Sequence, residues 1–349
     1  MSSAATPSKI EITHYNVGQG DAHSITVDNT TVLIDGDRKA GKQIRSKSGR
    51  ITKSSKQIQR EIAGQTTLIF IATHYDMDHI AGLDRLLKHV NVDKFYVPHE
   101  EYYNDITASA AATLQTADKQ GVSKKKVTNT TTCHIGTRQI DVDFLFPELM
   151  LGLPTGLLTK NDGIVTKFST NSNSSGKDVS ILFPGDLSVY IQNVLTREQK
   201  QELSVDGLVL PHHGSRQNLG INCTEIPSDV LDSIGVNRTE NGDLKRQIEE
   251  AIDSMGDVKK LKDWLQSDFL ELIDPDEVVI SARPTHNYNH PHLLTLAALH
   301  SSEITPNVYC TYRDGDITWN IDPSGSYSIE TQDSRMKHGT KHVLNDALK

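Results

Sequence analysis

Hydrophobic and polar positions alternate along the first part of the chain in the way that β-strands require. Within residues 10–37 the alternation is clear in HSITV and TVLID, so two or three strands are expected there, and the glycine-rich NVGQGD indicates a tight turn. Residues 66–74, TTLIFIATH, form a continuous apolar and β-branched run, which is typical of a buried strand. Further strands are expected at 94–99, 178–187, 205–215 and 277–282.

Helical patterns alternate with the later strands. The sequence predicts helices over 81–90, 102–126, 188–203 and 290–300. Two amphipathic patterns, at 243–255 and 258–273, predict a helical insert over residues 228–272. Residues 307–322 are expected to form a hairpin with an Asp-Gly turn. This order of elements predicts an α/β protein built as a layered sandwich, with its loops gathered at one edge.

The length of 349 residues suits one large domain or two modest ones. We expect one domain over 9–328, preceded by a flexible leader, 1–8, and followed by a mobile polar tail, 329–349. No apolar run is long enough for a membrane span, the N-terminus lacks the pattern of a secretory signal, and the three cysteines lie far apart. These features predict a reduced, cytoplasmic protein without a membrane association.

Ionisable side chains gather where four of the predicted strands end. They are His74, Asp76, Asp78 and His79; Asp186; His212 and His213; and His290 and His292. Imidazoles and carboxylates this dense are costly at the end of a buried strand unless something compensates their charge, and a metal ion does so. A lone histidine is usually a surface or core residue, but four such strand ends are hard to obtain by chance. The sequence therefore predicts a metal site.

The spacing of the first cluster suits two metal ions. Asp78 and His79, directly after a strand, can surround one ion, while His74 and Asp76, two positions apart, can project together toward another. Two divalent ions at one sheet edge can bind a phosphodiester, activate water and stabilise the developing charge.

The segment THYDMDHIAG resembles the signature of the metallo-β-lactamase superfamily, Thr/Ser-His-x-His-x-Asp-His. It is more similar still to the soluble metallohydrolase domain of ComEC-type competence proteins, the channels for DNA uptake, which carry His-x-Asp-x-Asp-His. The segments NVGQGDA, TVLIDGD, LFPGDL, LPHHGS and NYNHPH match that subfamily in order, over about residues 10 to 320. The resemblance implies a metallo-β-lactamase αββα sandwich and a nuclease or phosphodiesterase activity. Stand-alone relatives of this kind occur in bacterial defence and mobile-element neighbourhoods.

The resemblance also implies a role for each matching residue. The implied metal ligands are His74, Asp76, Asp78, His79, Asp186 and His213. Asp186 would bridge the two ions, although it also suits the N-cap of the following helix. The two predicted catalytic residues are Asp78, which would position the hydroxide, and His290, which would contact the phosphate or protonate the leaving oxygen. Supporting positions behind the ligands are implied for Asp21, Asp35 and His212.

An aspartate at position 76 replaces the superfamily's second histidine. Its hard oxygen ligand favours Mn²⁺ or Mg²⁺ relative to Zn²⁺, although the general affinity order still favours zinc. The superfamily's third histidine is not evident; Asn161 or Asp162 could take its place, and His134 is a competing candidate. We therefore expect two divalent ions, manganese or zinc, with a weak and oxygen-rich first site.

A basic segment, residues 38–60, contains nine lysines and arginines and no acid, on a chain whose net charge is −9. Because it lies between two motifs of the site, it is expected to bind a nucleic-acid backbone, although a solvated loop is the simpler interpretation. The alternatives to a nuclease are a small-molecule phosphoesterase, for a nucleotide or teichoic-acid-like diester, and a non-catalytic protein that keeps the fold. The helical insert 228–272 is a candidate surface for a protein partner. The residues expected to bind phosphate are Arg45, Lys47, Arg50 and Lys53.

Overall fold

A computed structural model shows how these segments are arranged. It describes residues 9–37, 52–99, 106–127, 131–135, 140–146, 162–170, 177–198, 203–236, 243–255, 258, 260–283, 290–304, 306–332 and 339–347. Within these ranges, none of the helices combines the length and the apolar character that crossing a membrane requires.

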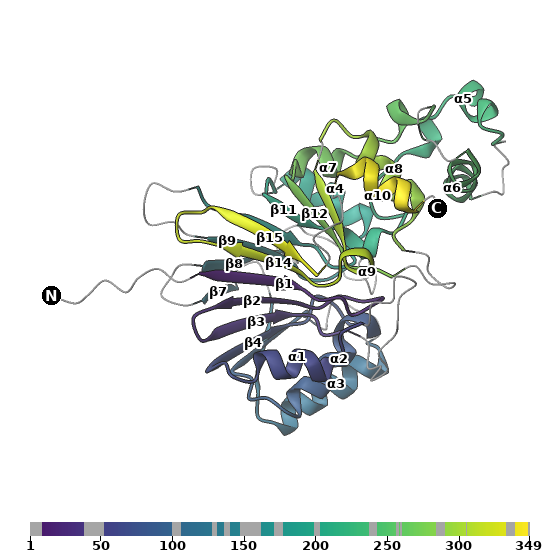
Figure 1. The fold of residues 1–349 in the computed structure, drawn as a ribbon. Helices are drawn as coiled ribbons and strands as arrows, with labels where there is room; N and C mark the ends of the chain where they lie inside the picture. Colours follow the sequence, from purple (N-terminus) through teal and green to yellow (C-terminus); the bar gives the residue numbers. More distant parts are fainter. Residues whose placement is uncertain are drawn as a thin grey trace.

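Two β-sheets pack face to face, and helices cover both outer faces (Figure 1). The first sheet has eight strands in the order β15–β14–β1–β2–β3–β4–β5–β6. Their bounds are β1 (Ile10–His14), β2 (His23–Val27), β3 (Thr30–Ile34), β4 (Thr67–Ile71), β5 (Lys94–Val97), β6 (Ser123–Lys126), β14 (Ile317–Ile321) and β15 (Tyr327–Thr331). Strands β3 to β6 run parallel, so their carboxyl ends meet at one edge. Two or three strands were expected within residues 10–37, and the structure has three, β1, β2 and β3.

The second sheet has seven strands in the order β13–β12–β11–β10–β9–β8–β7. Their bounds are β7 (Thr132–Ile135), β8 (Ile140–Phe146), β9 (Val165–Thr170), β10 (Ser180–Phe183), β11 (Gly207–Val209), β12 (Glu277–Ile280) and β13 (Asn307–Cys310). The four strands from β10 to β13 are parallel. This sheet therefore also gathers strand ends, and the loops that carry polar residues, at a single edge.

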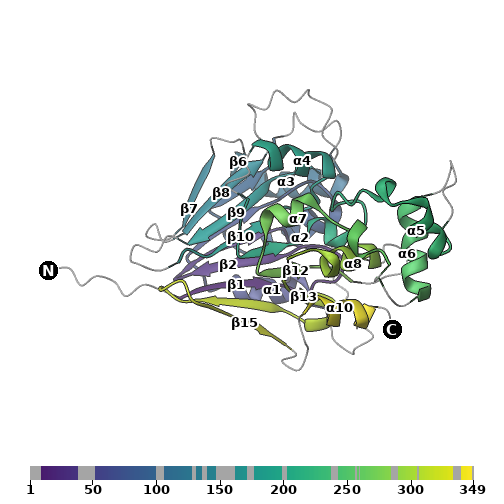
Figure 2. The same cartoon turned by 90° about the horizontal axis from the view of Figure 1, so that it is seen from above.

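The helices form the two outer layers (Figures 1 and 2). The first sheet is covered by α1 (Ser55–Ile62), α2 (Met77–Leu87) and α3 (Ala108–Lys119). The second sheet is covered by α4 (Val189–Glu198), α7 (Asp268–Ile273), α8 (Leu293–Ser301) and α10 (Thr340–Ala347), with α9 (Thr311–Asp314) after β13. The remaining helical segments are α5 (Ser228–Ser233), α6 (Leu244–Met255) and the short 3₁₀ turns η3 (Pro211–Gly214), η4 (Cys223–Glu225) and η5 (Lys262–Trp264). The layers are helix, sheet, sheet and helix, as the sandwich prediction required.

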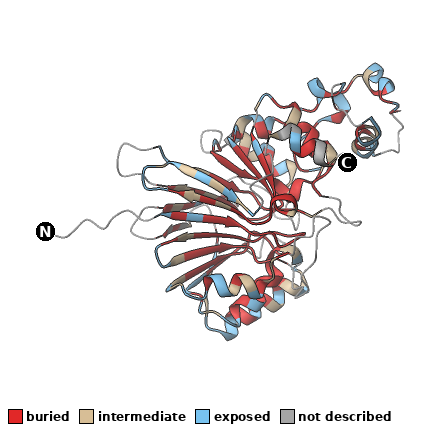
Figure 3. Cartoon of the chain, viewed as in Figure 1, coloured by how far each residue is buried: buried red, intermediate tan, exposed pale blue. Residues whose placement is uncertain are grey.

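Apolar side chains fill the space between the sheets, where the strands are mostly buried (Figure 3). Trp319 of β14 is fully buried in this layer. The strand opposite leaves room for it at Gly207, because a Cβ there would lie 2.7 Å from the indole Cη2. Two further apolar clusters join each sheet to its own helices.

Two sequence predictions, one of a hairpin and one of a long helix, are wrong. Residues 307–322 do not form a hairpin, because β13 belongs to the second sheet and β14 to the first, with α9 between them. Residues 102–126 do not form one helix: α3 ends at Lys119, and 123–126 is strand β6 at the edge of the first sheet. Three consecutive lysines suit this edge position, because lysine protects an edge strand from further pairing.

Two predicted helical regions also differ in detail. The pattern at 258–273 gives η5 and α7 as separate segments, and not one helix. The tail expected to be mobile instead contains α10, whose Val343 and Leu344 are buried against the second sheet's helical layer. The small apolar face of this helix is hidden in a mostly polar sequence.

Candidate metal centre

The predicted cluster forms at the edge where the parallel strands of both sheets end. Asp35 follows β3, and His74 follows β4. Asp78 and His79 lie in the first turn of α2, which begins three residues after His74. From the second sheet, Asp186 follows β10, and His212 and His213 follow β11. The fold thus brings together side chains that are up to 178 residues apart in the sequence, from 35 to 213.

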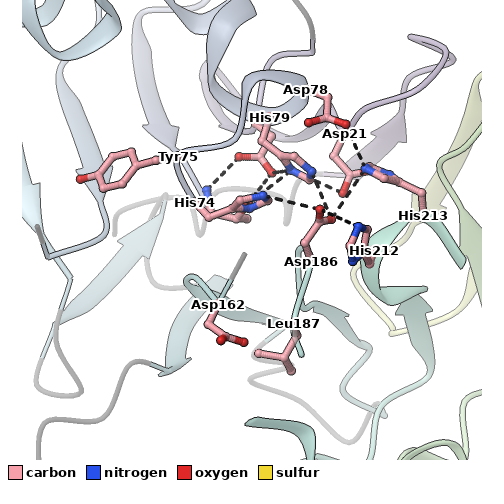
Figure 4. Close-up of polar contacts among 12 residues, drawn as sticks. Asp21, His74, Tyr75, Asp78, His79, Asp162, Asp186, Leu187, His212 and His213 are labelled. Atoms are coloured by element: carbon pink, nitrogen blue, oxygen red, sulfur yellow. Dashed lines mark hydrogen bonds and ion pairs between the residues drawn. The ribbon is translucent and has the colours of Figure 1, made fainter. Parts of the chain in front are cut away.

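Asp186 lies at the middle of the cluster, with imidazoles on both sides of its carboxylate (Figure 4). Its Oδ1 is 3.2 Å from Nε2 of His79 and 3.7 Å from Nε2 of His213. Its Oδ2 is 3.6 Å from Nε2 of His74 and 3.5 Å from Nε2 of His212. Each oxygen therefore faces a different pair of nitrogens, as a carboxylate that bridges two ions would require.

Hydrogen bonds at Nδ1 fix the orientation of the three buried imidazoles. Nδ1 of His213 donates to the Ser281 carbonyl at 2.8 Å, and Nδ1 of His79 lies 2.7 Å from Oδ2 of Asp35. Nδ1 of His74 lies 3.0 Å from Oγ1 of Thr73. When Nδ1 carries the proton, the lone pair is on Nε2, the atom that faces Asp186.

The Asp35 carboxylate organises two of these ligands at once. It accepts hydrogen bonds from the Thr73 amide at 2.8 Å and from the Thr73 hydroxyl at 2.6 Å. Because that hydroxyl proton is used on Asp35, the Thr73 oxygen can accept from His74. Asp35 is fully buried and holds both His74 and His79, in the supporting position that the sequence predicted.

Five buried polar atoms point into the cluster without any hydrogen bond among the described residues. They are Nε2 of His74, His79 and His213, Oδ1 of Asp186 and Oδ1 of Asp21. A buried polar atom without a hydrogen bond is costly, and five at one place suit the binding of a cation. Nitrogen and carboxylate donors together form a suitable set for a divalent transition-metal ion. The residues present therefore fit a metal centre.

Asp21 enters the cluster from the tight turn between β1 and β2. Gly20 permits this approach, because its φ is +144° and a Cβ there would lie 2.5 Å from the Asp78 carbonyl oxygen. Asp21, His79, Asp186 and His213 each offer a ligand atom within 4.8 Å of the others. The Asp21 carboxylate lies 3.4 Å from Nδ1 of His213, 3.7 Å from Nε2 of His23 and 3.8 Å from Nδ1 of His79. Asp21 thus lies beside the Nδ1 atoms of two imidazoles, and its supporting role stays a prediction.

The electrostatics of the cluster are those of opposite charges in close contact. Burial alone would lower the pKa of His213, but Asp21 and Asp186 outweigh it and raise that pKa to about 9. Burial is likewise outweighed at His79, where Asp186 and Asp35 raise the pKa well above its usual value. The same imidazoles hold the pKa of Asp186 well below its usual value despite burial. The raised pKa values mean that protons bind the His79 and His213 imidazoles tightly, and a divalent cation would have to displace them.

Other predicted residues lie around this cluster. Oδ2 of Asp78 is 3.7 Å from Nε2 of His213, and its side chain is 23% exposed, so it faces both the cluster and solvent. Asp76 occupies the N-cap position of α2 and is half-buried. The His290 ring is buried and stacks on the His212 ring at 5.7 Å. Burial, followed by His213, lowers the pKa of His290 to about 3, so its imidazole is neutral near pH 7.

Several predicted residues are placed elsewhere or not described. Asn161, Arg45, Lys47 and Arg50 lie outside the described residues. His134 is on β7, at the edge of the second sheet farthest from β12 and β13. Asp162 is buried near the site, where its Oδ1 accepts a hydrogen bond from the Ser188 amide at 3.0 Å.

Lys53, which was predicted to bind phosphate, is paired with two carboxylates. Its Nζ is 2.6 Å from carboxylate oxygens of both Glu61 and Asp316, and it lies 4.6 Å from the centre of the Tyr15 ring. The two carboxylates compensate the charge of Lys53. The contacts also join the segment before α1 to residues beside the first sheet. The end of the basic segment enters helix α1, Ser55–Ile62.

Sequence reasoning missed the groups that hold the ligands. Thr73 was detectable, because it directly precedes His74 as in the signature, but the Ser281 carbonyl has no side-chain signal. Also missed was Glu249 of α6, which pairs with Arg216 at 2.6 Å and accepts a hydrogen bond from the Leu293 amide at 2.6 Å. The predicted helical insert is therefore bonded to the loop after His213 and to the start of α8.

Comparison with known proteins gives three results. The model of the metallo-beta-lactamase superfamily matches residues 15–233. No curated protein sequence matches the chain. Among solved structures, the chain is similar to Igni18, a novel metallo hydrolase from the hyperthermophilic archaeon Ignicoccus hospitalis KIN4/I, with 12% identity, 92% of this chain and 98% of that chain covered, and a TM-score of 0.46. It is also similar to LRA-12, a class B3 di-zinc metallo-β-lactamase from an Alaskan soil metagenome, with 13% identity, 73% and 95% covered, and a TM-score of 0.35.

Proposed function

The chain belongs to the metallo-β-lactamase superfamily, and from this premise we propose that it is a metal-dependent phosphodiesterase that cleaves nucleic acid. The observation that carries the proposal is the Asp186 carboxylate, with one oxygen toward His79 and His213 and the other toward His74 and His212. A carboxylate in this position could hold two ions side by side, and such a pair would suit an in-line displacement at phosphorus.

The chain's own residues divide into three groups by what they do. His79, His213 and Asp78 would hold one ion, His74 and Asp76 would hold the other, and Asp186 would lie between them. When bound, the ions supply Lewis acidity that polarises the phosphodiester and makes water a better nucleophile. Asp35, Thr73 and the Ser281 carbonyl keep the imidazoles in one orientation, so that no reorganisation is needed during the reaction. Asp78 is exposed enough to orient a water molecule, and the neutral, buried His290 stacks on the His212 ring.

Two features support a phosphodiester of nucleic acid over other superfamily substrates. Asp76, Asp78 and Asp186 give the proposed ligand set three carboxylates, which suit hard ions and phosphate chemistry. The basic segment 38–60 supplies positive charge on an acidic chain. That charge can bind a long polyanion uniformly along its backbone, while a small diester reaches the centre without it.

The test measures hydrolysis of a plasmid, a single-stranded RNA, bis(p-nitrophenyl) phosphate and a chromogenic β-lactam, each with Mn²⁺ or Zn²⁺. We expect nucleic-acid cleavage that falls about a hundredfold or more in Asp78→Asn, because the attacking water is no longer positioned. Asp253→Asn, at an exposed position of α6, is the matched control and should keep full activity. Hydrolysis of the small diester without cleavage of nucleic acid would make the protein a small-molecule phosphoesterase. Hydrolysis of the β-lactam alone would refute phosphodiester chemistry.

A second variant tests the substrate class. Arg45, Lys47 and Arg50 are changed together to Glu, while Lys53 is left intact because it is paired with Glu61 and Asp316. KM for a polynucleotide should rise and its dependence on salt should weaken, with hydrolysis of the small diester unchanged. Equal loss on both substrates would show that the segment shapes the centre itself.

A further inference from the structure

The candidate centre has fewer buried imidazoles on the side of His74 than on the side of His79. Around Oδ1 of Asp186 lie two buried nitrogens, from His79 and His213. Around Oδ2, the only buried imidazole among the described residues is that of His74. Asp162, one of the residues predicted to fill the gap, uses Oδ1 to accept a hydrogen bond from the Ser188 amide.

His212 has the position that this gap requires. Its Nε2 lies 3.5 Å from Oδ2 of Asp186, almost the same distance as Nε2 of His74, at 3.6 Å. Ligand atoms about 2.0–2.1 Å from one tetrahedral ion lie roughly 3.3 Å apart, which is close to both values. Figure 4 shows His212 next to Asp186, on the opposite side of the carboxylate from His79.

The backbone of His212 is held in an unfavourable conformation to achieve this position. Its φ is 50° and its ψ is 45°, and the next residue, His213, also has a positive φ of 55°. Non-glycine residues rarely adopt this region, and such conformations persist where the surroundings impose them. Here the His212 amide donates to the Gly185 carbonyl at 3.0 Å, directly before Asp186. The turn thereby directs two consecutive imidazoles to opposite oxygens of one carboxylate.

The His212 ring is also fixed from its other face. It stacks on the buried His290 ring, with a distance of 5.7 Å between ring centres and an angle of 21° between the planes. Gly214 keeps the two segments in contact, because a Cβ there would lie 2.8 Å from Cβ of Pro291. A surface histidine without a role would not need this anchoring.

We propose that His212 is a direct ligand of the ion on the His74 side and takes the place of the missing third histidine. The proposal rests on the two-ion centre of the proposed function. The competing role is that of a positioning residue, in which His212 only donates a hydrogen bond to Asp186. The two roles predict opposite results for two replacements of His212. Glutamate can bind a metal ion but cannot donate a hydrogen bond, whereas glutamine can donate a hydrogen bond but is a poor metal ligand.

The test uses His212→Glu and His212→Gln, which are nearly isosteric, with His89→Ala at an exposed position just after α2 as the control. Bound zinc per chain is measured by elemental analysis after gel filtration, and both affinities by calorimetry. We expect two ions in the wild type, the control and His212→Glu, and one in His212→Gln, with the affinity of the remaining ion unchanged. Far-ultraviolet circular dichroism and thermal melting confirm that both variants are folded.

Three results would overturn the proposal: two ions in His212→Gln, loss of an ion in His212→Glu alone, or fewer than two ions in the wild type. Loss of an ion in His212→Glu alone would mean that His212 is a positioning residue, because the new carboxylate would repel the Asp186 carboxylate instead of binding the ion. Metal content does not depend on the substrate. A wild type with two ions that fails to cleave nucleic acid would therefore refute the proposed function and leave the role of His212 open to the same measurement.

Discussion

At the scale of single residues, local conformational preferences are overruled at several positions of the site. Asp35, Asp37, His212 and His213 all have positive φ values, between 50° and 71°, although none is glycine. All four lie in loops that follow strands β3 and β11, beside the candidate ligands. Strain of this kind costs of order 1–3 kcal/mol per residue and is retained where the surrounding structure imposes it. We infer that the sequence has been shaped here by the centre more than by stability.

The residues that were predictable from the sequence are those whose own side chains carry the chemistry. His74, Asp78, His79, Asp186 and His213 could be identified because imidazoles and carboxylates at the ends of buried strands are costly unless they bind something. The Ser281 carbonyl could not, since every residue has a carbonyl and only the fold brings this one 2.8 Å from His213. The charge of Lys53 was recognised, but its partner Asp316 lies 263 positions away, so its ion pair was invisible.

A residue-scale prediction concerns Glu277, at the start of β12 and far from the centre along the strand. Burial raises its pKa from 4.5 to about 6, against the opposing effect of the hydrogen bond from Asn307. Between these pH values the folded chain keeps a proton that the unfolded chain has released, so stability falls as pH rises from about 4.5 to 6. Glu277→Gln should remove this fall and raise the free energy of unfolding at pH 7 by about 1 kcal/mol. This gain is smaller than the full pKa shift would give, because water reaches the pocket beside Glu277.

Chemical denaturation at pH 4.5, 5.5 and 7 measures this difference. Glu330→Gln on the exposed face of β15 is the control and should follow the wild type at each pH. A Glu277→Gln protein with the same pH profile as the wild type would show that this carboxyl group ionises as it does in the unfolded chain.

At the scale of elements, strands with strong alternation were predictable and connections between the sheets were not. The segment NVYCTYRDGDITWNID has two apolar runs around Asp-Gly, which is a local hairpin signal. In the structure β13 instead pairs in parallel with β12, and the Asp314 carboxylate accepts a hydrogen bond from the Cys310 amide at 2.7 Å to close α9. The chain then crosses to β1 in the other sheet. Local turn chemistry cannot show this, because the competing partners are remote in sequence.

An element-scale prediction concerns the attachment of α6 to the site. Glu249 is buried and satisfies both Arg216, three residues after His213, and the Leu293 amide at the start of α8. Glu249→Ala should therefore lower the free energy of unfolding by about 2 kcal/mol, since it leaves a partly buried amide without its acceptor and the half-buried guanidinium with only Asp243, at 3.7 Å. It should also reduce hydrolysis, because the loop carrying His212 and His213 loses an anchor.

Glu250→Ala is a well-matched control, one position further along α6. Its carboxylate is 63% exposed and pairs with Arg246 only at 3.4 Å, so we expect a change within about 0.5 kcal/mol. Urea unfolding of the two variants, with turnover measured on the same preparations, gives the comparison. Equal effects from Glu249 and Glu250 would mean that α6 contributes only its helical surface.

At the scale of the whole molecule, each sheet supplies half of the centre. The first sheet contributes His74, Asp78 and His79, and the second contributes Asp186 and His213. The apolar layer around Trp319 fixes the two sheets relative to each other, so that neither half can form the centre alone. The layered fold was predictable from the alternation of elements, but the pairing of the two sheets across this layer required the structure.

This architecture makes metal binding a matter of global stability, which gives the last prediction. Ions that bind only the folded chain stabilise it by about 2.7 kcal/mol each at a hundred times their dissociation constant, or roughly 4 °C in Tm for 349 residues. Adding Mn²⁺ or Zn²⁺ to chelator-treated protein should raise Tm by at least this amount. Asp186→Asn should abolish most of the rise, because both nitrogen sets lose the carboxylate between them, while Asp253→Asn should keep it. A rise in Asp186→Asn equal to that of the wild type would place the bound metal elsewhere on the chain, and the two sheets would then meet at this edge for some purpose other than holding ions.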